Sequence, residues 1–239
     1  MRRLLSWKKK KQGLRICWVN PQYAHTKPAA HAAGFYLQYA TMNTPYILVL
    51  FYSRGGHTQR LAELIAQGIE SVGGIEARLR TVPPVAAQTT TALPPIPPTG
   101  APYATNDDLK NCSGLAMGSP THFGNMAAPL KHFLDQTSGL WLGGGLIGKP
   151  ASAFTSTGSL HGGQEMTLFT MMVPLMHHGM VMVGLPYDNS ELMGTRSGGT
   201  PYGASHFAGL NNDLVISDSE KKLAVAQGQH LARIALKLR

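Results

Sequence analysis

The stretch YILVLFYSRGGHTQR, residues 46–60, joins an apolar run to a turn rich in glycine and hydroxyl groups. The run is typical of a buried strand, and the turn stands where a helix should begin. The first N–H groups of a helix lack partners within it, so an anion is the natural ligand there. Gly55 and Gly56 would let the backbone approach that ligand, and Ser53 and Thr58 would add hydroxyl donors. The turn therefore predicts a phosphate site.

Two interpretations of this turn remain open. It matches neither the nucleoside-triphosphate loop, because no lysine follows the glycines, nor the pattern GxGxxG. In the alternative interpretation, the glycines only form a tight turn and Ser53 or Thr58 caps the next helix. Independently of this choice, Arg54 could contact a phosphate or face solvent, and for His57 we favour the solvent.

The length and composition favour one α/β domain without covalent crosslinks. The chain has 239 residues, enough to bury a large core. Cys17 and Cys112 are the only cysteines, too few for a disulfide framework or a structural zinc site, which suits a reducing cytoplasm. No apolar run approaches the roughly 18 residues of a membrane helix. We expect a soluble protein with no membrane association, and Cys112 as a small buried residue.

The net charge of +9 is concentrated at the N-terminus. Residues 1–44 contain eight Lys and Arg residues and no Asp or Glu, whereas the rest has 13 basic and 12 acidic residues. Nucleic acid is therefore an unlikely partner of the fold proper. Residues 1–41 could be an organelle transit peptide or a polyanion-binding tail. The interpretation we favour is a dispensable, disordered leader ahead of a domain at residues 42–239 that begins with Met42.

From residue 45 onward, apolar strands alternate with helical patterns, which predicts a parallel sheet covered by helices on both faces. Residues 83–106 are rich in proline and threonine and predict a surface excursion.

The run MTLFTMMVPLM, residues 166–176, favours packing over a cofactor site. The predicted strands are residues 46–53, 76–82 (an edge strand), 113–120, 150–157 and 181–186, and the predicted helices are 58–72, 126–137, 164–178 and 217–238.

Three polar loops follow successive strands of this predicted sheet. They read SRGGHT (53–58), SPTHFGNM (119–126) and TSTGSLHGGQE (155–165). Ligands of open parallel sheets lie at the carboxyl ends of the strands. Together the loops predict a site for a flat, hydrogen-bonding ligand.

These loops, with the segments GSPTHFGNMAAPLKHFLDQTSGLW (118–141), MHHGMVMVGLPY (176–187) and GGTPYGA (198–204), resemble the WrbA family. Members of that family are flavodoxin-like, FMN-dependent NAD(P)H:quinone oxidoreductases (type IV). The resemblance covers about residues 46–238. It implies a flavodoxin-like, doubly wound, five-stranded parallel sheet in the order 2-1-3-4-5.

The resemblance also implies a ping-pong reaction in a cytoplasmic homotetramer whose flavin sites are completed by neighbouring subunits. NADH or NADPH reduces FMN and leaves, and a quinone then takes two electrons. No catalytic acid or base is needed, because the flavin carries the chemistry. The implied FMN-binding residues are Ser53, Arg54, Gly55, Gly56, His57 and Thr58 at the phosphate; Thr121, His122 and Phe123 beside the ring; Ser156, Thr157, Gly158, Ser159, Leu160 and His161 at its polar edge; and His177 from a neighbouring element. Trp141 would wall the pocket for nicotinamide and quinone, and residues 198–204 would border a neighbour's flavin.

The sequence departs from the family pattern at two positions. Gly55 stands where relatives have a tyrosine that stacks on adenine, which leaves the preference between NADH and NADPH open. His122 stands where an arginine is common, and the loop after residue 155 has one extra residue. Neither change removes the expected FMN site.

Two other classes of function compete with the quinone reductase. A flavodoxin-type electron carrier would bind FMN without oxidising NAD(P)H, but such carriers are typically acidic and this domain is nearly neutral. A scaffold acting through the basic N-terminus is a third class. A metal site at His177 and His178 is disfavoured, because adjacent helical residues point about 100° apart.

Overall fold

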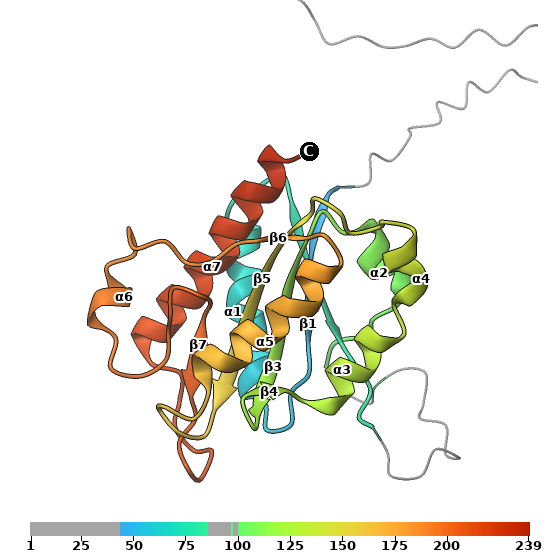
Figure 1. The fold of residues 1–239 in the computed structure, drawn as a ribbon. Helices are drawn as coiled ribbons and strands as arrows, with labels where there is room; N and C mark the ends of the chain where they lie inside the picture. The colour runs from blue at the N-terminus through green and yellow to red at the C-terminus, as the bar shows by residue number, and fades with distance from the viewer. Residues whose placement is uncertain (1–43, 86–96, 98–99) are drawn as a thin grey trace, which may run out of the picture. The chain divides into compact units, whose positions relative to one another are not determined.

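A computed structural model describes residues 44–85, 97 and 100–239. The predictions for residues 1–41, and for most of the excursion at 83–106, lie outside the described residues. Within them the chain forms a sheet with helices on both faces (Figure 1). None of the helices in this part of the chain is long and apolar enough to cross a membrane.

The central sheet has the strand order β2-β1-β3-β5-β6, and all of these neighbours are parallel. This is the predicted order 2-1-3-4-5. The fourth and fifth predicted strands are numbered β5 and β6, because the short strand β4 precedes them. The strands are β1 (Tyr46–Phe51), β2 (Glu76–Thr81), β3 (Gly114–His122), β5 (Pro150–Thr157) and β6 (Val181–Met182). As predicted, β2 lies at an edge of the sheet.

The last position of the sheet is divided between two segments. β6 pairs with the start of β5, and β7 (Ser205–Phe207) pairs with its end. The strand predicted at residues 181–186 is therefore only two residues long, since the chain leaves the sheet after Met182 and forms α6 (Glu191–Gly194) before it returns. The carboxyl end of β5 thus has two neighbours, β3 and β7.

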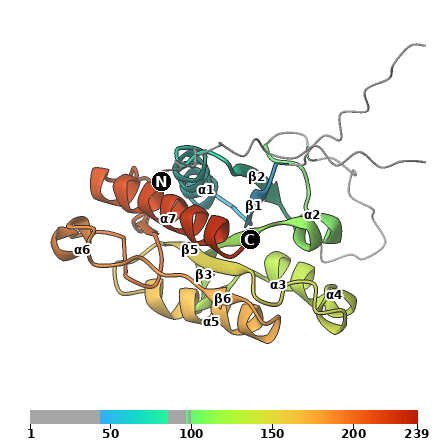
Figure 2. The same cartoon turned by 90° about the horizontal axis from the view of Figure 1, so that it is seen from above.

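One face of the sheet is covered by α1 (His57–Glu70) and α7 (Asp218–Lys237), as Figure 2 shows. α7 begins with a capping box, in which Ser217 and Glu220 bind each other's backbone N–H groups.

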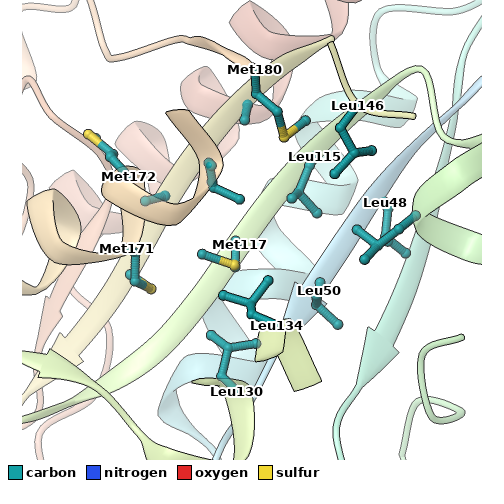
Figure 3. Packing of buried hydrophobic residues seen from close by; sticks show 14 of the residues in the cluster. Leu48, Leu50, Leu115, Met117, Leu130, Leu134, Leu146, Met171, Met172 and Met180 are labelled. Atoms are coloured by element: carbon teal, nitrogen blue, oxygen red, sulfur yellow. The ribbon is translucent and has the colours of Figure 1, made fainter. Parts of the chain in front are cut away.

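The other face is covered by α2 (Asn106–Asn111), α3 (Ala128–Asp135), α4 (Ser138–Leu142) and α5 (Gln164–His177). Leucines of β1 and β3 pack there against Leu130, Leu134 and Met171 (Figure 3). Half of the methionine-rich run therefore packs in the core, as predicted, while Met166, Phe169, Val173 and Met176 are exposed.

The single helix predicted over residues 126–137 is wrong in detail. Asn125 and Met126 form β4, which pairs antiparallel with the end of β3, and two helices follow it. α3 begins at Ala128 because Pro129 favours the first turn of a helix. Cys112 is buried at the end of α2, where burial raises the pKa of its thiol to about 11.

Candidate functional site

The loop between β1 and α1 starts the helix without a side-chain cap. Gly56 stands at the N-cap with a φ of 87°, a conformation that glycine adopts at little cost. Ser53 Oγ accepts a hydrogen bond from the Gly56 N–H at 3.1 Å, so Ser53 closes the loop and does not cap the helix. The capping interpretation is therefore not what the structure shows, and the first turn of α1 keeps its N–H groups for another acceptor.

Hydroxyl groups hold the ends of β3 and β5 together beside this loop. Thr155 Oγ1 donates to the carbonyl of Ser119 at 2.8 Å, and the hydroxyls of Thr121 and Thr167 lie 2.9 Å apart. Thr157 Oγ1 donates to the carbonyl of Ser159 at 2.9 Å, which turns the chain at the end of β5. These bonds fix the two loops relative to the sheet.

The three loops enclose one cleft of about 440 Å³ at the carboxyl ends of the strands. Its lining, as the described residues form it, contains Arg54 and two histidines and no carboxylate, so an anion would meet no like charge in the wall. The lining residues are Ser53, Arg54, Gly55, His57, Thr58, Pro120, Thr121, His122, Ser156, Thr157, Gly158 and Asn212.

Asn212 belongs to a fourth loop that the sequence analysis missed. It has a φ of 57°, and its carbonyl lies 3.1 Å from His57 Nε2. A Cβ atom on residue 55 would lie 2.5 Å from Asn212 Nδ2, so the glycine makes room for this asparagine. The signal in the sequence was the polar run LNND, residues 210–213, between a short strand and a helix.

His57 faces the cleft on one side and a buried histidine on the other. Its Nδ1 lies 3.1 Å from His206 Nε2, and the two rings are stacked with centroids 4.9 Å apart. His206 is fully buried in β7, and its Nδ1 lies 3.1 Å from Glu220 Oε2. His57 therefore does not simply face solvent, and the structure connects it to the core.

Glu220 is a buried carboxylate whose oxygens are satisfied by hydrogen bonds. Burial by itself raises its pKa, but hydrogen bonds from His206 and from the N–H groups of Phe207 and Ser217 outweigh burial and lower the pKa to about 2. The Gly198 N–H also donates to it, at 2.7 Å. Glu220 is therefore charged at neutral pH.

Several predicted site residues lie outside the lining of the cleft. Gly56 lines a neighbouring hollow on the other side of His57, while Leu160 and His161 line a hollow of about 670 Å³ together with Phe169 and Arg196. Ser159 is exposed in the turn between them and the cleft. The structure places these residues beside the cleft, at the same rim of the sheet.

Trp141 and His177 lie away from the cleft within this chain. Trp141 Nε1 donates to the carbonyl of His177 at 2.8 Å, and both line a hollow of about 450 Å³ between α3, α4 and α5. Helix α5 separates them from the cleft, because its 14 residues rise about 20 Å from Gln164 to His177. The structure thus brings the two residues together but does not bring them to the cleft of the same chain.

Phe123 stands at the tip of the β3–β4 hairpin in an unfavourable conformation. It is fully exposed with a φ of 54°, and Gly124 follows with a φ of 73°. This turn type favours asparagine at its first position and disfavours aromatic residues. Strained residues cluster at ligand sites, and Phe123 directly follows His122 of the cleft.

We expect Phe123→Asn to raise the free energy of unfolding by about 1 kcal/mol, because asparagine tolerates the left-handed conformation. Urea unfolding followed by circular dichroism measures this. Phe123→Ala is the matched control: it removes the ring and keeps the strained Cβ, so it should not stabilise. A Phe123→Asn protein as stable as the wild type would contradict the argument.

Comparison with known proteins identifies the family. A family model described as NADPH-dependent FMN reductase matches residues 46–188, more than half of the chain. The chain belongs to this family.

Solved structures similar to this member of the NADPH-dependent FMN reductase family show the fold. A flavodoxin, WrbA-like protein from Agrobacterium tumefaciens has a TM-score of 0.59 at 22% identity, over 82% of this chain and 99% of that one. A flavodoxin from the domain Archaea has a TM-score of 0.53 at 20% identity, over 80% of this chain and 99% of that one. Flavodoxin 1 from Bacillus cereus has a TM-score of 0.52 at 15% identity, over 79% of this chain and 97% of that one. The predicted flavodoxin-like fold is confirmed.

The match to the NADPH-dependent FMN reductase family does not extend over the whole site. It contains the three loops after β1, β3 and β5, and it ends at residue 188. Asn212, His206 and Glu220 follow that residue, so they belong to the C-terminal part of the chain that the family model does not cover.

Proposed function

We propose that this member of the NADPH-dependent FMN reductase family binds FMN in the cleft and reduces quinones with NADH or NADPH, as an enzyme of the WrbA type. The observation that supports the proposal most is the cleft itself. Its three loops begin at the ends of neighbouring parallel strands, and one of them leaves α1 without a side-chain cap. Among the described residues, no carboxylate lines the cleft. This is a suitable environment for a phosphate monoester attached to a flat ring.

The donors in the cleft fit both ends of FMN. At the phosphate end, Ser53 and Thr58 offer hydroxyls beside the first turn of α1, and Gly55 makes room for the side chain of Asn212, which lines the same cleft. At the ring end, Thr157 and Gly158 of the β5 loop line the cleft. Beyond them, Ser156, Ser159, Leu160 and His161 would hold the polar edge, with Thr121, His122 and Phe123 beside the ring.

When bound, FMN would supply the redox chemistry, taking a hydride from the nicotinamide and passing two electrons to the quinone. The chain would contribute position and shielding. The hydroxyl bonds between Thr155, Ser119 and Thr121 keep the β3 and β5 loops at a fixed separation. No side chain is required to act as a catalytic acid or base in this proposal.

A second copy of the chain would complete the site in the proposed homotetramer. His177 and Trp141 lie together in their own hollow, about one helix length from the cleft of their own chain. Four apolar residues of α5 are exposed between the two places: Met166, Phe169, Val173 and Met176. Burying this face against another copy would carry His177, Trp141 and residues 198–204 toward a neighbour's flavin and form the pocket for nicotinamide and quinone.

The proposal is tested by reconstituting the purified protein with FMN and adding NADH or NADPH anaerobically, then benzoquinone. We expect the flavin absorbance to bleach with the nucleotide and to return with the quinone. If FMN binds and no nucleotide bleaches it, the flavodoxin-type electron carrier becomes the better interpretation.

The phosphate end of the site is tested by Thr58→Val. This substitution keeps the shape of the side chain and removes a hydroxyl, so FMN should bind about tenfold more weakly. Riboflavin, which lacks the phosphate, is the matched control ligand and should bind the wild type and the variant equally. An equal loss for both flavins would place Thr58 away from the phosphate.

A further inference from the structure

A continuous chain of contacts leads from the cleft to a buried negative charge. Asn212 O lies 3.1 Å from His57 Nε2, His57 Nδ1 lies 3.1 Å from His206 Nε2, and His206 Nδ1 lies 3.1 Å from Glu220 Oε2. His206 Nε2 also lies 3.2 Å from the carbonyl of Leu214. His206 and Glu220 are at most 1% exposed. All four imidazole nitrogens of the pair therefore have partners.

These contacts determine how many protons the two rings hold. A carboxylate accepts, so His206 Nδ1 carries a proton that it donates to Glu220; the Asn212 carbonyl accepts, so His57 Nε2 carries a second. Two neutral imidazole rings carry only these two protons. The remaining nitrogens would then face each other as two lone pairs at 3.1 Å, which is repulsive. A third proton between them makes every contact a hydrogen bond.

We propose that His57 and His206 share one extra proton, and that this pair is the fixed positive charge that binds the phosphate of FMN. The inference rests on the proposed function and deepens it: the phosphate-binding loop has no lysine, and an imidazole pair takes the place of one. His57 would face the phosphate. His206 would act through His57 as a positioning residue, held by Glu220.

Other charged groups also lie near the pair. Arg54 and His122 line the cleft with exposed side chains, and neither forms an ion pair among the described residues. Arg60, Asp213 and Lys221 line the hollow on the other side of His57. Of these, Arg60 pairs with Glu63, and Lys221 pairs with Asp218. Glu220 is the carboxylate in direct contact with the pair.

The shared proton makes FMN binding depend on pH. As pH rises and the third proton leaves, the two rings lose their mutual hydrogen bond and the phosphate loses one positive charge, while Arg54 keeps its own. The affinity for FMN should fall, while the affinity for riboflavin should not change. Measurements from pH 7 to 9 are suitable, because the second pKa of a phosphate monoester is about 6 and the dianion predominates there.

The first test counts the protons in the wild-type protein without ligand. Nitrogen-15 spectra of the histidine side chains at neutral pH should show three protonated nitrogens shared between His57 and His206. Two neutral rings in the spectra would overturn the proposal. This measurement needs no substitution, so it does not depend on a variant that folds.

The second test compares dissociation constants of FMN and riboflavin in the wild type, His206→Gln and His230→Gln. Glutamine can donate to Glu220 but cannot hold the extra proton. We expect His206→Gln to bind FMN about tenfold more weakly near pH 7 and to lose the pH dependence of the FMN-to-riboflavin ratio. His230→Gln, the same substitution on α7 away from the cleft, should keep the wild-type profile.

The outcomes separate this inference from the proposed function. If the wild type binds neither flavin, the proposed function fails. If it binds both, but the ratio does not change with pH and is the same in His206→Gln, the shared proton is not what holds the phosphate and only this inference fails.

Discussion

Substituting Gly228 by alanine is expected to lower the free energy of unfolding by about 3 kcal/mol, near the upper end of the usual cost of overpacking. Gly228 lies in α7, where a Cβ atom would overlap the carbonyl oxygen of Ile65 in α1 and would lie 3.0 Å from the Ile69 nitrogen. These are backbone atoms, so no side chain can rotate away. The helices must separate, which opens the core between them and the sheet.

The contact is reciprocal, which increases the expected cost. Gly68 of α1 faces the backbone of Val225 in α7 in the same way. The two helices lie side by side on one face of the sheet (Figure 2) and cover Ile47, Val49 and Phe154. A wider separation at either glycine therefore weakens the packing over these residues.

Gly139→Ala in α4 is the matched control, because no atom lies within 4 Å of a Cβ there. Alanine should stabilise this position by up to about 1 kcal/mol, as expected from helix propensity alone. Urea unfolding of the three proteins measures both effects. Equal stability of Gly228→Ala and the wild type would show that α1 and α7 are not packed through their backbones.

The central strands and the long helices could be predicted from the sequence because each is a long periodic segment. Strand β5 was predicted at the residues it occupies, and α5 to within one residue. The division of the last sheet position between β6 and β7 could not be predicted. Two or three residues carry no periodicity, and pairing with β5 is what defines them as strands.

The candidate site was predictable only where it is formed by strand ends. The loops after β1, β3 and β5 meet in one cleft because parallel strands end at the same edge. Asn212 enters from a loop with no repeating pattern. Glu220 lies in the first turn of α7, where acidic residues are favoured, but its second role, holding His206, depends on the tertiary fold. The separation of Trp141 and His177 from the cleft likewise follows from the course of α5.

Replacing Glu220 by glutamine is expected to abolish a large part of the pH dependence of stability in acid. The folded pKa of Glu220 is about 2, against an ordinary value of 4.5, because hydrogen bonds from His206 and backbone N–H groups outweigh the effect of burial. A group with a lowered folded pKa stabilises the protein above its unfolded pKa. That contribution, about 3 kcal/mol, is lost as pH falls from about 4.5 to about 2.

The variant and the wild type should therefore differ most at neutral pH and least near pH 2. Glutamine keeps the size of the side chain and can still cap α7, because its one oxygen can accept from His206 and Ser217, which both bind Oε2 of Glu220. Its NH2 group would then face the N–H groups of Phe207 and Gly198, which donate to Oε1 of Glu220, and cannot accept from them. Free energies of unfolding from urea titrations between pH 2 and 7 measure this difference. Glu165→Gln, an exposed residue in the first turn of α5, should stay within about 0.5 kcal/mol of the wild type throughout. If the free energies of unfolding of Glu220→Gln and the wild type differ by a constant amount over this range, the variant is destabilised by its altered packing. The charge of Glu220 would then not be stabilised by His206.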